Sequence, residues 1–305
     1  MHAASAMSPL DVRPYGRQLA PGQRSVLTIL DARSGATETV FATDSLIEAP
    51  NWTPDGAHLI FNAGGQLWRI TAEGGTPRLI DTRPVEDLNN DHVLSPDGKR
   101  IYLSSNDSHL YVVESEGGTP VRVSNVHDKP WRYYLHGVSP DERELAYVAI
   151  EGQGPDARRN IFTLPAAGGP DRRLTDFDRP SDGPEYSPDG QWLYFNAEPD
   201  GSAEGHAQIF RMRRDASGIE QLTFDERVNW FPHVSPDGST VAYLSYPPGT
   251  LGHPADRDVV IRSMSPDGGP VRDLIAFHGG QGSLNVNSWA PDSCRLAFVA
   301  YPMGG

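Results

Sequence analysis

Short runs of apolar residues, separated by turn residues, recur along the whole chain, and the 3.6-residue period of amphipathic helices is nearly absent. A Pro-Asp turn, most often followed by Gly, divides these runs, and its prolines stand at positions 54, 96, 140, 188, 236 and 291. Proline and aspartate suit the first positions of a tight turn, and glycine accepts a positive φ. The spacings of 42, 44, 48, 48 and 55 residues between these prolines are typical of propeller blades.

Apolar and aromatic runs on both sides of each turn predict four antiparallel strands per repeat. The strand after the turn is expected at residues 59–61, 100–103, 145–148, 192–195, 241–244 and 296–299. The next strand is expected at residues 66–70, 110–113, 160–164, 208–212 and 258–262. Glycine-rich hairpin turns follow, and they lead to outer strands such as residues 172–175 and 220–223.

The two ends of the chain complement each other. Residues 25–31 and 37–42 are predicted strands without a preceding Pro-Asp turn, whereas the last such turn is followed by a single strand. The N-terminal outer strands are therefore expected to join C-terminal inner strands in one blade, which removes open sheet edges. The predicted fold is an all-β, six-bladed β-propeller with four-stranded antiparallel blades. Residues 1–22 are expected to form a lead-in segment, and residues 23–305 a single domain.

The predicted blades sort the connections onto the two faces of the disc. The Pro-Asp and glycine-rich turns share one face, and the longer connections share the other. Function concentrates on loops that a rigid scaffold holds, so we expect the site on the second face, near the axis. The connections that lead into the innermost strands are rich in histidine, aromatic and amide residues, and they span residues 82–92, 125–136, 176–185, 224–233 and 275–286.

Several of these connections end in a potential metal ligand that is expected to point into the central channel. The ligands stand three or four positions before their turn prolines, and they are His92, His136, Glu185 and His233. Strand alternation separates the two spacings unless a bulge intervenes. Imidazoles with one oxygen ligand, from Glu185 or Gln281, suit a divalent transition metal such as Mn, Fe, Ni or Zn. The alternative is that each histidine bonds the backbone of a neighbouring blade.

Other polar and aromatic residues of the same connections are candidates for ligand binding. Aromatic rings stack on sugar rings and arginines pair with carboxylates, although interblade packing and solvated loops are the alternatives. The candidate substrate-binding residues are Asn90, Asp91, Arg132, Arg158, Trp230 and Asn285. His253, in a Gly-His-Pro loop, and Tyr134 are the candidate catalytic acid or base residues.

Composition narrows the classes of partner and location. Lys and Arg number 26 against 40 Asp and Glu, and the net charge of −14 argues against nucleic acid or an anionic membrane as partner. A single cysteine excludes an internal disulfide. The first 20 residues contain no continuous apolar stretch, which predicts a cytoplasmic protein.

The repeated Ser-Pro-Asp-Gly turns and the Leu-Thr ends of the outer strands resemble the PD40-type repeats of TolB-like propellers over about residues 24–302. More distantly, the repeats are similar to oligogalacturonate lyases, propellers that hold a divalent metal with several histidines and a glutamine and cleave uronate oligosaccharides by β-elimination. That second resemblance implies that the metal residues here are His92, His136, His233 and Gln281.

Together these features predict a metal-dependent enzyme that acts on a sugar or sugar acid at the axial mouth, by a lyase-like β-elimination. The metal would stabilise an enolate, and His253 or Tyr134 would take the proton next to the acid group. The ligand would be a small molecule or an oligosaccharide. The alternative hypothesis is a non-catalytic TolB-like propeller whose mouth binds a peptide or a loop of a protein partner.

Overall fold

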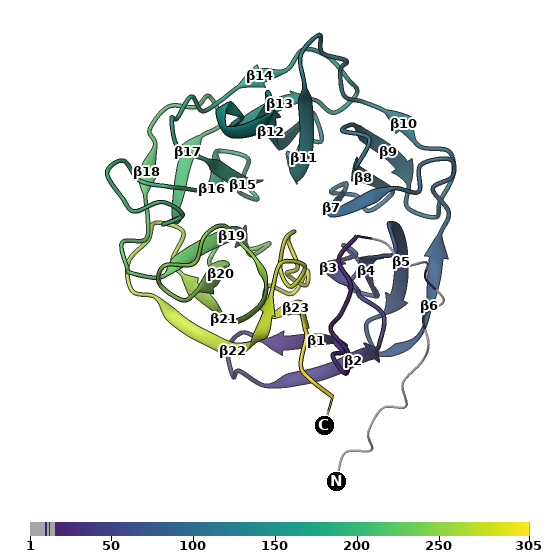
Figure 1. The fold of residues 1–305 in the computed structure, drawn as a ribbon. Helices are drawn as coiled ribbons and strands as arrows, with labels where there is room; N and C mark the ends of the chain where they lie inside the picture. The colour runs from purple at the N-terminus through teal and green to yellow at the C-terminus, as the bar shows by residue number, and fades with distance from the viewer. Residues whose placement is uncertain (1–9, 11, 13–15, 305) are drawn as a thin grey trace.

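The computed structural model describes residues 10, 12 and 16–304, and it confirms the six-bladed β-propeller (Figure 1). Over these residues, five sheets contain four strands and one contains three, and all paired strands are antiparallel. The only helical element of the described chain is a short 3₁₀ turn, Gly154–Asp156. None of its helices has the length and apolar character needed to cross a bilayer.

The five complete blades follow one another along the chain. The first contains β3 (Glu48–Trp52), β4 (His58–Ala63), β5 (Gln66–Thr71) and β6 (Gly74–Ile80). The second contains β7 (Leu88–Leu94), β8 (Arg100–Ser105), β9 (Leu110–Glu114) and β10 (Val121–Arg122). The third contains β11 (Trp131–Val138), β12 (Glu144–Glu151), β13 (Arg158–Pro165) and β14 (Arg172–Arg173). The fourth contains β15 (Ser181–Tyr186), β16 (Trp192–Ala197), β17 (Gln208–Arg213) and β18 (Glu220–Gln221). The fifth contains β19 (Val228–Val234), β20 (Val241–Tyr246), β21 (Ala255–Met264) and β22 (Arg272–Gly280).

The sixth blade closes the ring as predicted, with strands from both ends of the chain. It contains β1 (Ser25–Asp31), β2 (Thr37–Thr43) and β23 (Arg295–Ala300), seen in purple and yellow in Figure 1. An irregular segment, residues 281–288, occupies the position of its innermost strand and is followed by a single bridge from Trp289 to Leu296. The sequence predicted a connection at residues 275–286, and this prediction is corrected: β22 continues to Gly280, so the connection begins only after that residue.

The core lies between the blades. The strand that follows each Pro-Asp turn places a large side chain against its neighbouring blades, and five of these are Tyr102, Tyr147, Tyr194, Tyr243 and Phe298, each at most 2% exposed. Burial of one such side chain contributes roughly 1.5–3 kcal/mol. Because the apolar side chains are buried between the blades, the core does not need the central axis, and polar side chains can occupy it.

The innermost strand of every complete blade contains a β-bulge or irregularity in its pairing. In three blades, a residue with positive φ directly precedes a proline: Ala49 (53°), Gly183 (60°) and Phe231 (55°). Proline has no N–H for the ladder, so within sheets it is found at edges and bulges. These bulges redirect the side chains that enter the channel, and the simple alternation considered in the sequence analysis does not hold there.

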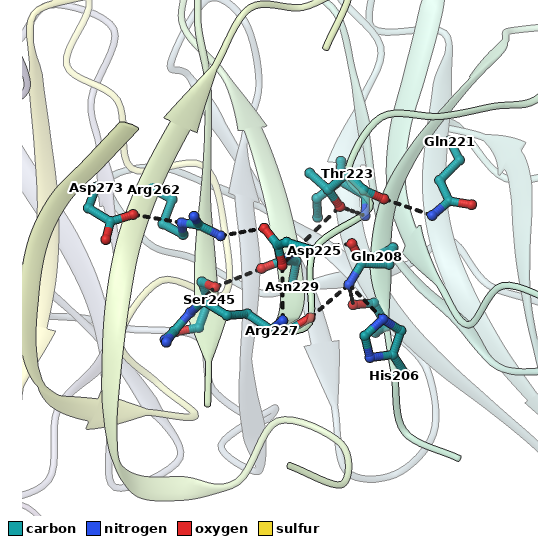
Figure 2. A network of polar contacts seen from close by, with 12 residues as sticks. His206, Gln208, Gln221, Thr223, Asp225, Arg227, Asn229, Ser245, Arg262 and Asp273 are labelled. Carbon is teal, nitrogen blue, oxygen red and sulfur yellow. Dashed lines mark hydrogen bonds and ion pairs between the residues drawn. The ribbon is translucent and has the colours of Figure 1, made fainter. Parts of the chain in front are cut away.

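A polar network joins the fourth and fifth blades (Figure 2). Asn229, which is fully buried, accepts a hydrogen bond from the Ser245 hydroxyl (2.7 Å) and directs its NH₂ group toward Asp225 (3.3 Å). Arg262 connects the same Asp225 to Asp273 on the outer strand. The network anchors the connection between the two blades to the sheet of the fifth.

Replacement of Asn229 by alanine is expected to lower the free energy of unfolding by roughly 1–3 kcal/mol, because buried partners lose a hydrogen bond. Gln221→Ala is the control, since Gln221 lies at the edge of the network with one bond to the Thr223 carbonyl, and we expect about 0.5 kcal/mol or less. Urea unfolding of both variants makes the test. Equal losses in the two variants would contradict the assigned role.

Candidate functional site

Six side chains at one equivalent position of the six blades line the axial mouth. Each stands six residues before its turn proline, and they are Glu48, Asn90, Tyr134, Asp182, Trp230 and Asn285. The first five belong to innermost strands, and Asn285 belongs to the irregular segment 281–288. Because the blades are related by rotation about the axis, equivalent positions converge there and form a ring of mixed chemistry.

This ring opens into an axial cavity of about 530 Å³ on the face that carries the long connections. A second cavity of about 370 Å³ adjoins it and shares the wall residues Asn89, Asn90 and Gln281. Arg17, from the segment before the first strand, and Glu48 line this smaller cavity. Both volumes fall in the range of small-molecule sites, which run from about 300 to 1,000 Å³.

An aromatic wall separates two histidines in the axial cavity. The ring of Phe231 stacks on His136 at 5.7 Å between centroids and meets His253 edge-on at 5.0 Å. The ring of Trp230 lies 4.5 Å from that of His253. Gly183 leaves room for this wall, since a Cβ there would lie 3.2 Å from the ring of Phe231.

His136 is buried between two carboxylates. Its Nε2 lies 3.3 Å from an oxygen of Asp182. Burial opposes the charged imidazolium, but Asp91 and Asp182 outweigh that cost and raise the pKa of His136. Burial raises the pKa of Asp91 to about 6, partly offset by His136, whereas the pKa of Asp182 is lowered because His136 outweighs its burial. Both carboxylates therefore favour the protonated form of His136 inside the cavity.

His253 has the opposite environment. Burial against the aromatic wall lowers the pKa of His253, and the nearby charges of His136 and Arg159 add to the effect, whereas Asp182 and the hydrogen bond to the Gln281 oxygen act in the opposite direction. Its Nδ1 lies 2.5 Å from the side-chain oxygen of Gln281. The surroundings of His253 therefore favour the neutral ring, whereas those of His136 favour the imidazolium.

The proposed metal ligands His233 and Glu185 form a hydrogen-bonded pair deeper in the channel. Nδ1 of His233 lies 2.6 Å from Glu185, and its Nε2 lies 3.1 Å from the Leu284 carbonyl. Glu185 also accepts bonds from the Val234 N–H and the Asn287 amide. With both ring nitrogens facing oxygen acceptors, His233 has no lone pair directed at a metal, and the pair connects three blades instead.

The remaining predicted ligands make other contacts. Burial lowers the pKa of His92 to about 4, and His92 is not among the residues that line either cavity. His136 pairs with Asp182, and Gln281 bonds His253. Among the described residues no three His, Cys, Asp or Glu side chains are grouped so as to hold a metal. The five predicted ligands do not fit one shared metal site, and the metal cofactor stays a prediction.

The predicted arginines are placed outside the cavity. Arg132 and Arg158 are exposed, and Arg158 pairs with Asp176 (3.6 Å) and Asp178 (3.4 Å). Arg159 lines the axial cavity instead.

Sequence reasoning did not single out Arg17, Glu48 and Asp182, which line the two cavities. The constant distance of six residues to the turn proline would have identified Glu48 and Asp182. Arg17 has no periodic signal, because it precedes the repeats. It pairs with Glu48 at 3.3 Å and bonds the Gln281 carbonyl at 3.1 Å.

Comparisons with known proteins agree with this architecture. The family model of the TolB beta propeller domain, PD40, matches residues 136–299. An uncharacterised protein of Agrobacterium fabrum is 39% identical over 283 residues, which cover 91% of this chain and 92% of that protein. A solved structure from Agrobacterium tumefaciens, with a provisional TolB name, is 37% identical, has a TM-score of 0.84 and covers 92% of this chain and 99% of its own.

A more distant structural neighbour is an oligogalacturonate lyase in complex with manganese. It is 17% identical, has a TM-score of 0.58, and covers 85% of this chain and 74% of its own. At this level of identity the likeness shows the fold alone.

The buried Asp91 generates a prediction on the pH dependence of stability. Its pKa of about 6 in the folded chain exceeds the ordinary value of 3.8, so its contribution is full below pH 4 and is lost as pH rises through 6. Asp91→Asn removes this loss. Relative to wild type, the variant should gain on the order of 1–3 kcal/mol between pH 4 and pH 7, as measured by urea unfolding.

Asp97→Asn provides a control of opposite sign. The Lys99 N–H and the Ser95 hydroxyl lower the pKa of Asp97 to about 2, so this variant should lose stability relative to wild type as pH rises. A difference between Asp91→Asn and wild type that stays constant with pH would contradict the burial of an ionisable Asp91.

Proposed function

This chain belongs to the PD40 family of TolB-type β-propellers, and we propose that it is an enzyme that acts on a sugar or sugar acid in its axial cavity by proton transfer. One observation carries the proposal: the cavity holds two histidines in opposite environments. His136 lies between the carboxylates of Asp91 and Asp182, and His253 lies against Trp230 and Phe231. Paired titratable groups whose environments differ in this way indicate an acid and a base.

The walls of the cavity fit a sugar ring. Trp230 and Phe231 offer apolar faces for the C–H surface of such a ring. The amides of Asn90 and Asn285 offer donors and acceptors for hydroxyl groups. Arg159 is the arginine of the axial wall, and a guanidinium group pairs with a substrate carboxylate.

The reaction class that uses both histidines is a β-elimination. Neutral His253 takes the proton from the carbon next to the carboxylate, and that electron pair forms a carbon–carbon double bond as the β carbon–oxygen bond breaks. The imidazolium of His136 gives its proton to the leaving oxygen. The products are an unsaturated sugar acid and an alcohol, and the two histidines exchange protons with solvent to return to their starting states.

Arg159 is assigned to the charge that develops on the substrate carboxylate, since the five predicted metal ligands do not fit a common site. Tyr134 also lines the cavity, as expected for a residue that contacts substrate. The name of the manganese-bound neighbour, oligogalacturonate lyase, suggests the first substrates to test.

Turnover of uronate disaccharides tests the proposal, beginning with digalacturonate and followed by the ultraviolet absorbance of the new conjugated double bond. Wild type should form the product, and His253→Gln should lower kcat by roughly 100- to 10,000-fold. Trp230→Ala should mainly raise KM, because it removes a stacking surface. His278→Gln is the matched control, since His278 pairs with Asp258 on the outer strands.

Two results would contradict the enzyme proposal. One is full activity in His253→Gln. The other is binding of sugar acids in the cavity without turnover of any disaccharide in the panel, which would favour the non-catalytic binding propeller.

A further inference from the structure

We propose that Gln281 and Asn285 are positioning residues that hold His253 in one tautomer, with the proton on Nδ1 and the lone pair of Nε2 open to the axial cavity. The catalytic meaning of this tautomer rests on the proposed function. The tautomer itself is a property of the ligand-free protein.

The first link begins at a group whose role as a donor is certain. The backbone N–H of Gly282 lies 2.7 Å from the side-chain Oδ1 of Asn285. A backbone amide donates only, so the atom of Asn285 that faces it is the oxygen. This orientation leaves the NH₂ group of Asn285 on the other side, where it lies 3.0 Å from Gln281.

The second link transmits this orientation to His253. Because the NH₂ group of Asn285 donates only, Gln281 meets it with its oxygen, Oε1. The same oxygen lies 2.5 Å from Nδ1 of His253. An amide oxygen has two lone pairs and accepts both bonds. Nδ1 of His253 therefore carries the proton, and in the neutral ring Nε2 carries none.

Nε2 of His253 is left available for chemistry. No hydrogen bond joins it to any described residue, and it is not among their buried unpartnered atoms. Since His253 lines the axial cavity, the lone pair of Nε2 is open to a ligand there. The charged and titratable groups around the ring are Asp182 of β15, His136 of β11 and Arg159 of β13, and burial keeps the ring neutral by lowering its pKa.

The start of the relay is held rigidly by the backbone. Gly282 has a φ of 88°, and an added Cβ would lie 2.5 Å from the Tyr301 hydroxyl and 2.6 Å from Glu48. Its carbonyl accepts the N–H of Ala49, the bulge residue of the first blade, at 2.7 Å. Contacts with two neighbouring blades thus fix the direction of the Gly282 N–H. The role of the irregular segment 281–288 is to hold this N–H and the side chains of the relay in place.

This assignment changes the role of Gln281. The sequence suggested its oxygen as a metal ligand, whereas here that oxygen accepts hydrogen bonds from Asn285 and His253. Both of its lone pairs are used within the protein. The relay therefore leaves the lone pair of His253 Nε2 open to the cavity.

Nitrogen-15 NMR of the histidine rings in the ligand-free protein tests the inference, with the His253 signals assigned by their loss in His253→Gln. In wild type at neutral pH, Nδ1 should carry the proton and Nε2 should show the shift of an unprotonated nitrogen. Gln281→Met removes the acceptor and should move the proton to Nε2 in a large share of molecules. Gln281→Glu keeps an oxygen acceptor and should retain the wild-type tautomer, which controls for misfolding.

A wild-type His253 protonated on Nε2, or an unchanged tautomer in Gln281→Met, would overturn the inference. Turnover distinguishes this failure from failure of the proposed function. The expected tautomer without turnover of any uronate refutes the enzyme proposal and leaves the relay standing. If both hold, Gln281→Met should lower kcat at least tenfold with little change in KM, and Gln281→Glu should move the acidic limb of the pH profile upward, because a carboxylate favours the imidazolium.

Discussion

The bulge in the innermost strand of each blade is the constraint on which the axial site depends. A regular strand would send alternate side chains into the channel, but the paired register shifts in all five complete blades. Where Ala49, Gly183 and Phe231 adopt positive φ before a proline, the strand turns and presents the preceding residue to the mouth. The ring at the mouth and the hydrogen-bonded pairs below it both follow from this geometry.

Histidines at two depths of the channel have different roles. His233 uses both ring nitrogens in contacts with Glu185 and the Leu284 carbonyl, and it joins blades. His253 uses one nitrogen in its contact with Gln281 and keeps the other for the cavity. The distinction rests on lone pairs rather than on burial, and it separates structural from chemically available histidines in a channel that contains both.

Much of the fold follows from local sequence signals. Turn chemistry at a regular spacing predicts the blades, and the strand Ser25–Asp31 and the closing of the ring by both chain ends agree with the structure. The axial residues are harder to predict, because bulges change which side chains point inward. Asn90, Tyr134, Trp230 and Asn285 were identified, and Asp182 escaped notice although it occupies the same repeat position. Whether several side chains meet at one metal depends on the directions in which they point, and the spacing of residues in the sequence does not determine those directions.

A crystal structure of His253→Gln with a uronate disaccharide is the most direct test of the central claim, that the axial cavity holds a sugar acid between an acid and a base. The account predicts one sugar ring stacked on Trp230, its carboxylate at Arg159, the adjacent carbon facing residue 253 and the leaving oxygen facing His136. A disaccharide bound outside the axial cavity, or bound there with its carboxylate turned toward Asp91 and Asp182, would contradict the account.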